Sequence, residues 1–215
     1  MARFFTLAAL LTLSAICGCS EAGQPSPVVT TQISSLPRDL AELIDAGLVN
    51  VVSANGKGSS SGAAIDGVIR NESTENLKID IVMSRAVFFQ NGGSGQNMIA
   101  SMILGEGGKY SAEGEHSFLS LKPSEQVRVT FIAYCADFDK ENPTSSEVFT
   151  IATAPPNLMG VMRRISAYSR AHPDEDVTAA AQVAVWLAQG ISADTTREKF
   201  SFSPGDEALA RTLAQ

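Results

Sequence analysis

Apolar and polar side chains alternate with a period of two residues through the middle of this chain, from about residue 48 to residue 152. The most regular run covers residues 127–134, where Val129 and Phe131 alternate with Arg128 and Thr130. Such alternation predicts strands that place one face on a core. The expected strands cover residues 49–53, 63–70, 77–83, 86–90, 98–104, 117–121, 127–134 and 148–152.

Short turn signals separate these runs, for example Asn-Gly-Gly at residues 91–93 and Lys-Pro-Ser at residues 122–124. Several short strands at this spacing predict an antiparallel β-sandwich. Residues 121–129 resemble the turn into a late strand of bacterial immunoglobulin-like domains. This resemblance implies an immunoglobulin-like form of the sandwich.

Helical periodicity replaces the alternation after residues 155 and 156, both proline. An apolar stripe through Leu158 and Ile165 predicts one helix, and acidic residues 174–176 begin a second. We expect a helical hairpin packed on the sheet, with Trp186, the only tryptophan, as its anchor. Residues 191–215 read as a polar tail with a weak helix after Gly205. The predicted class is therefore α+β: an antiparallel immunoglobulin-like β-sandwich with a C-terminal helical hairpin packed on it.

An apolar run at residues 4–16 follows Arg3 and leads into Ile-Cys-Gly-Cys at residues 16–19. The run is too short to span a bilayer, which needs about 20 apolar residues, and matches a cleaved signal peptide. Ile16 and Gly18 stand three and one residues before Cys19, so the segment resembles a bacterial lipoprotein signal. That resemblance implies lipidation, including palmitate, at Cys19. The alternative is a plain secreted protein.

The chain divides, on this interpretation, into four parts: a signal peptide (1–18), a flexible tether (19–36), a short helix with the β-sandwich (37–152), and the helical hairpin with its tail (153–215). The tether is expected to be disordered because it is polar and contains proline. No other segment is apolar enough to span a membrane, so the lipid would be the anchor. Ser20 after the cysteine favours sorting to the outer membrane, on its periplasmic face or at the surface.

The formal net charge is −7, and lysines and arginines are scattered. Because phosphate contacts dominate nucleic-acid affinity, we expect no nucleic-acid partner. Three cysteines are encoded, and loss of Cys17 with the signal and lipidation of Cys19 leave only Cys135. We therefore expect no disulfide, no zinc cluster and no cofactor.

Three local patterns resemble known sites but do not predict a catalytic or metal role. Residues 58–62 (Gly-Ser-Ser-Ser-Gly) fit a nucleophile elbow, but a strand and not a helix is expected after them. Residues 137–142 collect three acids, yet an EF-hand loop would need glycine and glutamate where Asn142 and Val148 stand. An irregular calcium site remained the alternative to a solvated acidic loop. His116 and His172 have no nucleophile or metal-ligand pattern near them.

Cys135 and Gln182 are the candidate reactive pair. Tyr134-Cys135 ends the most regular strand, and residues 182–186 (Gln-Val-Ala-Val-Trp) lie on the second expected helix. These two segments resemble the thioester domains of bacterial surface adhesins, which implies a bond between the cysteine sulfur and the glutamine carbonyl. The opposing interpretation is that Cys135 is a buried small apolar residue and that Gln182 ties the helix to the sheet.

Residues 95–98, 134–137, 142–143 and 182–186 together resemble a family of bacterial envelope proteins to which no activity is assigned. The sequence predicts a non-enzymatic, lipid-anchored envelope protein that binds or scaffolds another envelope component. The expected partners are envelope proteins. The alternative is a reactive thioester module of the adhesin type at Cys135 and Gln182.

Overall fold

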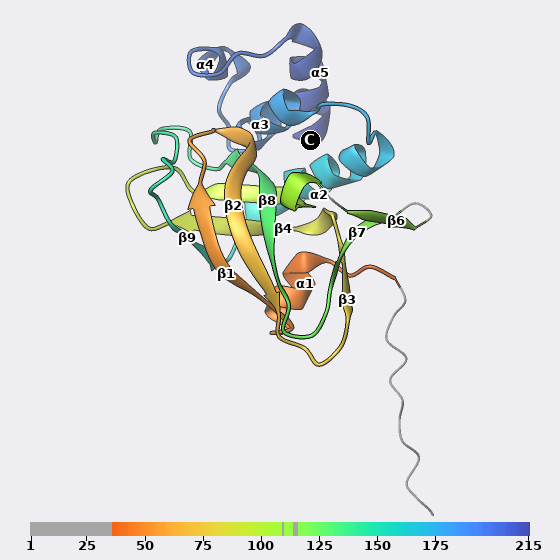
Figure 1. The fold of residues 1–215 in the computed structure, drawn as a ribbon. Coiled ribbons are helices and arrows are strands. Elements are labelled where there is room, and N and C mark those ends of the chain that lie inside the picture. The colour runs from red at the N-terminus through yellow and green to blue at the C-terminus, as the bar shows by residue number, and fades with distance from the viewer. Residues whose placement is uncertain (1–35, 109, 114–115) are drawn as a thin grey trace, which may run out of the picture. The chain divides into compact units, whose positions relative to one another are not determined.

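Nine strands form two antiparallel sheets in the part of the chain that the computed structural model describes, residues 36–108, 110–113 and 116–215 (Figure 1). These residues belong to one compact unit that extends to Gln215. The proposed signal peptide, Cys19 and nearly all of the proposed tether lie outside the described residues, so those assignments stay predictions.

The larger sheet contains six strands in the order β1-β2-β8-β5-β4-β9, and each neighbouring pair is antiparallel. Its edge strands approach each other at an isolated bridge between Asn55 and Val148, so the sheet is nearly closed and barrel-like. The strands are β1 (Val49–Gly56), β2 (Ser61–Asn71), β4 (Val82–Asn91), β5 (Met98–Gly105), β8 (Gln126–Cys135) and β9 (Phe149–Ala152).

The smaller sheet has the order β3-β7-β6 and consists of β3 (Leu77–Asp80), β7 (His116–Leu121) and β6 (Ser111–Glu113). The alternation at residues 77–83 predicted one strand, but the chain divides there, and β3 and β4 join different sheets. Buried Asp80 fixes the division: it accepts a hydrogen bond from the Val82 N–H and pairs with Arg170 at 2.7 Å. Alternation reports which face is buried, and it does not report where a strand changes its pairing partner.

Phenylalanines fill the interior of the larger sheet. Phe89 packs edge-to-face on Phe131 and on Phe149, with ring centroids 4.8 and 6.2 Å apart. Gly67 of β2 is required at this point, because an added Cβ would lie 2.7 Å from the Phe131 ring. The aromatic layer and the glycine together let β2 lie close over the core.

The short helix α1 (Leu40–Asp45) is fixed to the sheet by the Asp39 carboxylate. This side chain accepts hydrogen bonds from the backbone N–H groups of Ala41 and Glu42 as the N-cap of α1. It also accepts from the N–H groups of Ser84 and Arg85 in β4. One buried carboxylate therefore joins the helix to the sheet.

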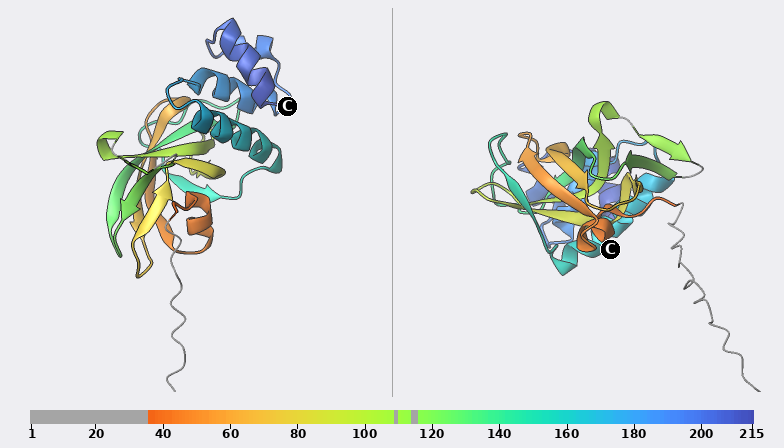
Figure 2. Two further views of the ribbon diagram at one scale, coloured as in Figure 1. Left: turned by 90° about the vertical axis from the view of Figure 1, so that its right-hand side faces the viewer. Right: turned by 60° about the horizontal axis from the view of Figure 1, so that its bottom comes forward.

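The C-terminal helices gather on one side of the larger sheet (Figure 2). They are α2 (Pro156–Ala171), α3 (Thr178–Leu187), α4 (Ala193–Arg197) and α5 (Pro204–Leu213). The predicted hairpin corresponds to α2 and α3. Trp186 of α3 is 3% exposed, which confirms that it is a core residue. Its ring packs edge-to-face on Phe138, which follows β8, and on Phe200, between α4 and α5.

The weak helix expected after Gly205 corresponds to α5, but the description of residues 191–215 as a polar tail misses α4 and the packing of this segment. Two helices form there, and α5 packs on α3 with Ala210 and Leu213 buried. The low apolar content hid this, because a short helix needs only one narrow apolar stripe to pack.

The α+β class, the antiparallel strands and the packed C-terminal helices are confirmed. The arrangement differs from a sandwich of two similar sheets, since six strands join one sheet whose edges converge. Hydrogen-bond partners decide how strands divide between sheets, and residue patterns do not encode those partners directly.

Candidate functional site

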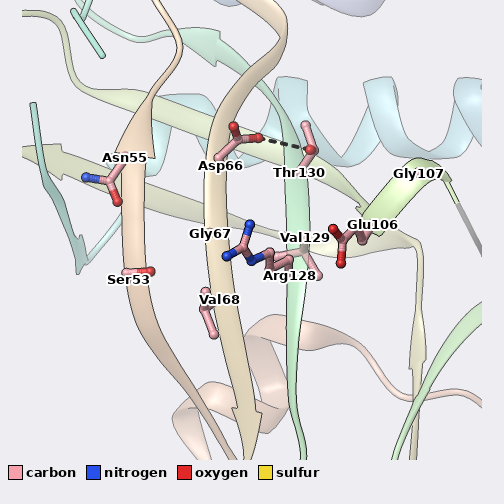
Figure 3. Close-up of a pocket in the computed structure, with 10 residues that line it drawn as sticks. All are labelled: Ser53, Asn55, Asp66, Gly67, Val68, Glu106, Gly107, Arg128, Val129 and Thr130. Atoms are coloured by element: carbon pink, nitrogen blue, oxygen red, sulfur yellow. Dashed lines mark hydrogen bonds between the residues drawn. The ribbon is translucent and has the colours of Figure 1, made fainter. Parts of the chain in front are cut away.

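A polar groove of about 360 Å³ runs over the outer face of β1, β2 and β8 (Figure 3). On β2 and β8 its charged residues are the outward members of alternating strands, so the rigid sheet fixes their backbone positions. Its lining residues are Ser53, Asn55, Asp66, Gly67, Val68, Glu106, Gly107, Arg128, Val129 and Thr130.

Strand register arranges the outward side chains in two rows. Ser53 pairs with Val68, and Val68 pairs with Arg128, which forms the first row. The strand pairing of β5 with β8 ends at the Gly105–Val129 pair, and Glu106, at the start of the 3₁₀ turn η1 (Glu106–Gly108), lines the same groove as Arg128. The second row contains Asn55, Asp66 and Thr130, paired in the same way.

The second row is internally paired. Asp66 accepts a hydrogen bond from the Thr130 hydroxyl at 3.1 Å and forms an ion pair with Lys57 at 2.8 Å. These contacts lie at the surface, where such a pair contributes about 0–1 kcal/mol to stability. Asp66 is therefore held in place by its neighbours and still faces solvent.

The first row contains two charges without partners. Neither the Arg128 side chain nor the Glu106 side chain forms a hydrogen bond or an ion pair with any residue that the structure describes, although both line the groove. Figure 3 shows the reason: the Arg128 guanidinium lies over the β2 side of β8, and Glu106 lies on the other side of that strand. A cation and a carboxylate thus stay available on the same surface.

A second groove of about 560 Å³ lies between α1, β4, β9 and the beginning of α2. Most of its lining residues are apolar by type and include Phe88, Ile151 and Met159. The charged residues at its rim, Arg85 and Asp45, pair with each other at 2.8 Å. This groove can accept apolar groups, but it offers less charged recognition than the groove over β2 and β8.

The structure brings Cys135 and Gln182 together. The Cys135 N–H donates to the Gln182 side-chain oxygen at 2.8 Å, and the Gln182 amide donates to the Cys135 carbonyl at 3.0 Å. Both residues are fully buried, and the Cys135 N–H is shared with the Ser60 carbonyl at 2.9 Å. The carboxamide thus ties α3 to the end of β8 in the way the opposing interpretation expected.

The Cys135 thiol takes no part in these two hydrogen bonds and lies 3.5 Å from the Met98 sulfur. Burial, with a smaller effect from the charge of Asp137, raises the pKa of this thiol far above its ordinary value. The thiol form is therefore favoured at neutral pH, and thiolate is the form that attacks electrophiles. A thioester would replace the Gln182 amide nitrogen, and with it the hydrogen bond to the Cys135 carbonyl.

The glycine- and serine-rich residues 58–62 form the connection between β1 and β2, and the final two residues already belong to β2. A strand follows the serine and not a helix, so the loop interpretation is confirmed and the nucleophile-elbow pattern is not met.

The acidic segment after β8 is held by local polar contacts. Asp137 accepts hydrogen bonds from the backbone and side chain of Asn97 and pairs with Lys140 at 3.0 Å. Among the described residues, no group of three or more histidine, cysteine or acidic side chains is arranged to hold a metal ion.

The two histidines lie apart. His116 is 3.7 Å from Asp80 where β7 meets the junction between the sheets. His172 stacks on Tyr168 and lies 3.1 Å from Glu175, at the turn between α2 and α3. Neither histidine lines the groove over β2 and β8.

Sequence reasoning did not select Arg128 and Glu106 as site residues. Arg128 was visible as a polar member of the alternation at residues 127–134, which is also the pattern of an ordinary solvated face. Only the structure, which places Glu106 in the same groove and leaves both unpaired, separates this position from other outward charges.

Comparison of the chain with protein-family models, with curated proteins and with solved structures found no match. The resemblances to lipoprotein signals, to thioester domains and to an envelope family therefore stay hypotheses. Within the described part of the chain, every helix is too short or too polar to cross a membrane.

Proposed function

We propose that this protein is a non-enzymatic, lipid-anchored envelope protein that binds another envelope component through the groove over β2 and β8. The observation that carries the proposal is the pair of unpartnered charges, Arg128 and Glu106, on a rigid sheet face. Buried charges need partners for folding, whereas exposed charges without partners are free to bind a ligand. The charges of the groove can therefore bind a ligand without affecting the packing of the core.

The support for a role other than catalysis is the state of the candidate nucleophile. Cys135 is fully buried, and its raised pKa disfavours the reactive thiolate. No histidine lines the groove, so a serine–histidine pair is not present among its described residues. These features favour binding over chemistry.

Lipidation at Cys19 is the proposed anchor, and the location is the outer membrane on its periplasmic face or at the surface. It is tested by Cys19→Ser, which should give an unprocessed or soluble product without palmitate label. Continued labelling and membrane fractionation of this variant would exclude the anchor.

Binding through the groove is tested by photo-crosslinking in the source bacterium with the full-length protein. A crosslinking amino acid at Val68, inside the groove, should give a discrete adduct. The same amino acid at Arg163, on the exposed side of α2, serves as the matched position outside it. Arg128→Glu should abolish the Val68 adduct, and an adduct that persists in this variant would place binding elsewhere.

The thioester module is the second candidate, because the Gln182 carboxamide contacts Cys135 directly. Thioester formation would release ammonia. The intact mass of the native protein, measured before and after methylamine treatment, decides between the two. A mass that lacks one ammonia and is restored by methylamine would favour the adhesin-like module.

The immunoglobulin-like form of the β-domain is likewise a proposal. It is supported by the antiparallel pairing and by the resemblance of residues 121–129 to a turn in such domains.

A further inference from the structure

Arg128 and Glu106 are two opposite charges that do not neutralise each other. Both line the same groove, Arg128 from β8 and Glu106 from the turn η1. Figure 3 shows their charged groups on opposite sides of β8. The groove between β1, β2 and η1 therefore presents a cationic position and an anionic position separated by one strand.

Each position has its own chemical preference. The Arg128 guanidinium offers planar paired donors that suit a carboxylate. The Glu106 carboxylate accepts hydrogen bonds and suits an ammonium group. Around them, Ser53, Asn55 and Thr130 supply neutral polar groups that can bond to amides.

From this arrangement we propose that the groove binds a short zwitterionic peptide, with the peptide carboxylate at Arg128 and the ammonium group at Glu106. An extended dipeptide spans about 7 Å, which exceeds the spacing of about 4.8 Å between neighbouring strands, so its two ends can lie on either side of β8. The groove volume of about 360 Å³ is near the lower end of small-molecule sites and fits a ligand of this size. This inference rests on the proposed binding function and names the ligand class of the same groove.

The second row supports the assignment. Asp66 is already occupied by Lys57 and Thr130, so it competes less for the ammonium group than Glu106 does. A ligand that carries only a carboxylate would be repelled by Glu106. A ligand that carries only an ammonium group would be repelled by Arg128. A ligand with both charges satisfies both residues and avoids both repulsions.

The test uses three dipeptides that differ in one charge at a time: alanyl-alanine, its N-acetyl form and its C-terminal amide. Each is titrated by calorimetry into the full chain in detergent, and amide shifts of Gly67, Gly107 and Val129 are followed by NMR. We expect alanyl-alanine to bind about tenfold tighter than either blocked form, since each charged hydrogen bond contributes more than a neutral one.

Two variants assign the ends of the ligand. In Arg128→Gln the preference for alanyl-alanine over its amide should disappear, and in Glu106→Gln the preference over the N-acetyl form should disappear. Arg163→Gln, which removes one charge from α2 outside the groove, should change neither preference. Unchanged melting temperatures of the variants show that folding is retained.

The zwitterionic assignment would be overturned by any of three results. These are equal affinity for the three dipeptides, no shifts at the groove amides, or an equal loss of the preference for alanyl-alanine in Arg163→Gln. Crosslinks at Val68 that require Arg128 would in that case still support binding through the groove to a ligand of another class. If alanyl-alanine binds as expected but Arg128→Glu leaves crosslinking unchanged, the ligand site stands and the proposed envelope function falls.

Discussion

The two parts of β8 show opposite uses of polar groups. At its end, Cys135 is fully buried, and its backbone is bonded to Gln182 and Ser60. Seven residues earlier, Arg128 is exposed and has no partner among the described residues. At the buried end, the hydrogen bonds between Cys135 and Gln182 hold α3 on the sheet. At the exposed position, the charge of Arg128 has no partner and is available to a ligand. On the proposed function, the same strand serves stability at one position and ligand recognition at another.

The largest effect is expected where α3 packs beside the buried end of β8. Trp186→Ala should lower the free energy of unfolding by about 3–5 kcal/mol, the usual range for truncation of a buried aromatic side chain. The indole N–H has no partner among the described residues, so the loss is one of packing. Urea denaturation measures it, with Val148→Ala at an exposed apolar position as control. A loss below about 1 kcal/mol, within the ordinary range for point substitutions, would show that Trp186 is not an anchor.

The tie between Gln182 and Cys135 should give the next largest effect. Gln182→Met keeps the length of the side chain and removes both hydrogen bonds, so the Cys135 carbonyl is left buried without this donor. We expect a loss of about 1–3 kcal/mol. The control is Gln189→Met, which removes one bond to Val185 at a half-buried position. Equal losses in the two variants would contradict a special role for the tie.

Alkaline pH should weaken the buried end of β8. Burial raises the pKa of the Cys135 thiol and raises the pKa of Tyr134 to about 12, so the folded protein keeps protons that the unfolded chain releases. The free energy of unfolding is therefore undiminished by this proton below the ordinary thiol pKa of about 8.5. Above that pH it decreases by up to about 1.4 kcal/mol per pH unit for one proton. Denaturation curves from pH 7 to 10 measure this decrease.

The comparison variant for the pH series is Cys135→Ala. It should be less stable at neutral pH and should show a flatter dependence up to about pH 10, where unfolded tyrosine begins to titrate. A thiol that reacts with a thiol reagent in the native protein at neutral pH would contradict the buried assignment.

The smallest effect is expected at the exposed position of β8. Arg128→Gln should change the free energy of unfolding by no more than about 0.5 kcal/mol, as surface substitutions without partners do. The same variant should lose the preference for a free carboxylate in the dipeptide titration. A large loss of stability would show that Arg128 supports the fold, and the contrast between the two positions would disappear.

Several features could be predicted from residue order. Period-two alternation located the strands of the larger sheet, and helical periodicity located α2 and α3, because both patterns report directly which side of an element is buried. The lone Trp186 in an apolar stripe was correctly predicted to be a core residue. The α5 packing was missed, since a polar segment with a narrow apolar stripe resembles a solvated one.

Pairing and position were decided only by the tertiary structure. The split of residues 77–83 between two sheets depends on Asp80 and Arg170, which lie 90 residues apart in the chain. The same applies to the candidate site: the sequence identified Cys135 and Gln182 as a pair but left open whether they form a thioester or whether Gln182 only ties the helix to the sheet. It did not identify Arg128 and Glu106, because an outward charge on a strand becomes a site only when register sets its neighbours.

The sequence by itself therefore determined which residues are buried and which kinds of element they form, because burial follows local periodicity. The tertiary structure decided which strands pair, that Gln182 bonds to the backbone of Cys135, and that two opposite charges share a groove without meeting. These outcomes depend on contacts between residues far apart in the chain, and such contacts leave no periodic trace in the order of the residues.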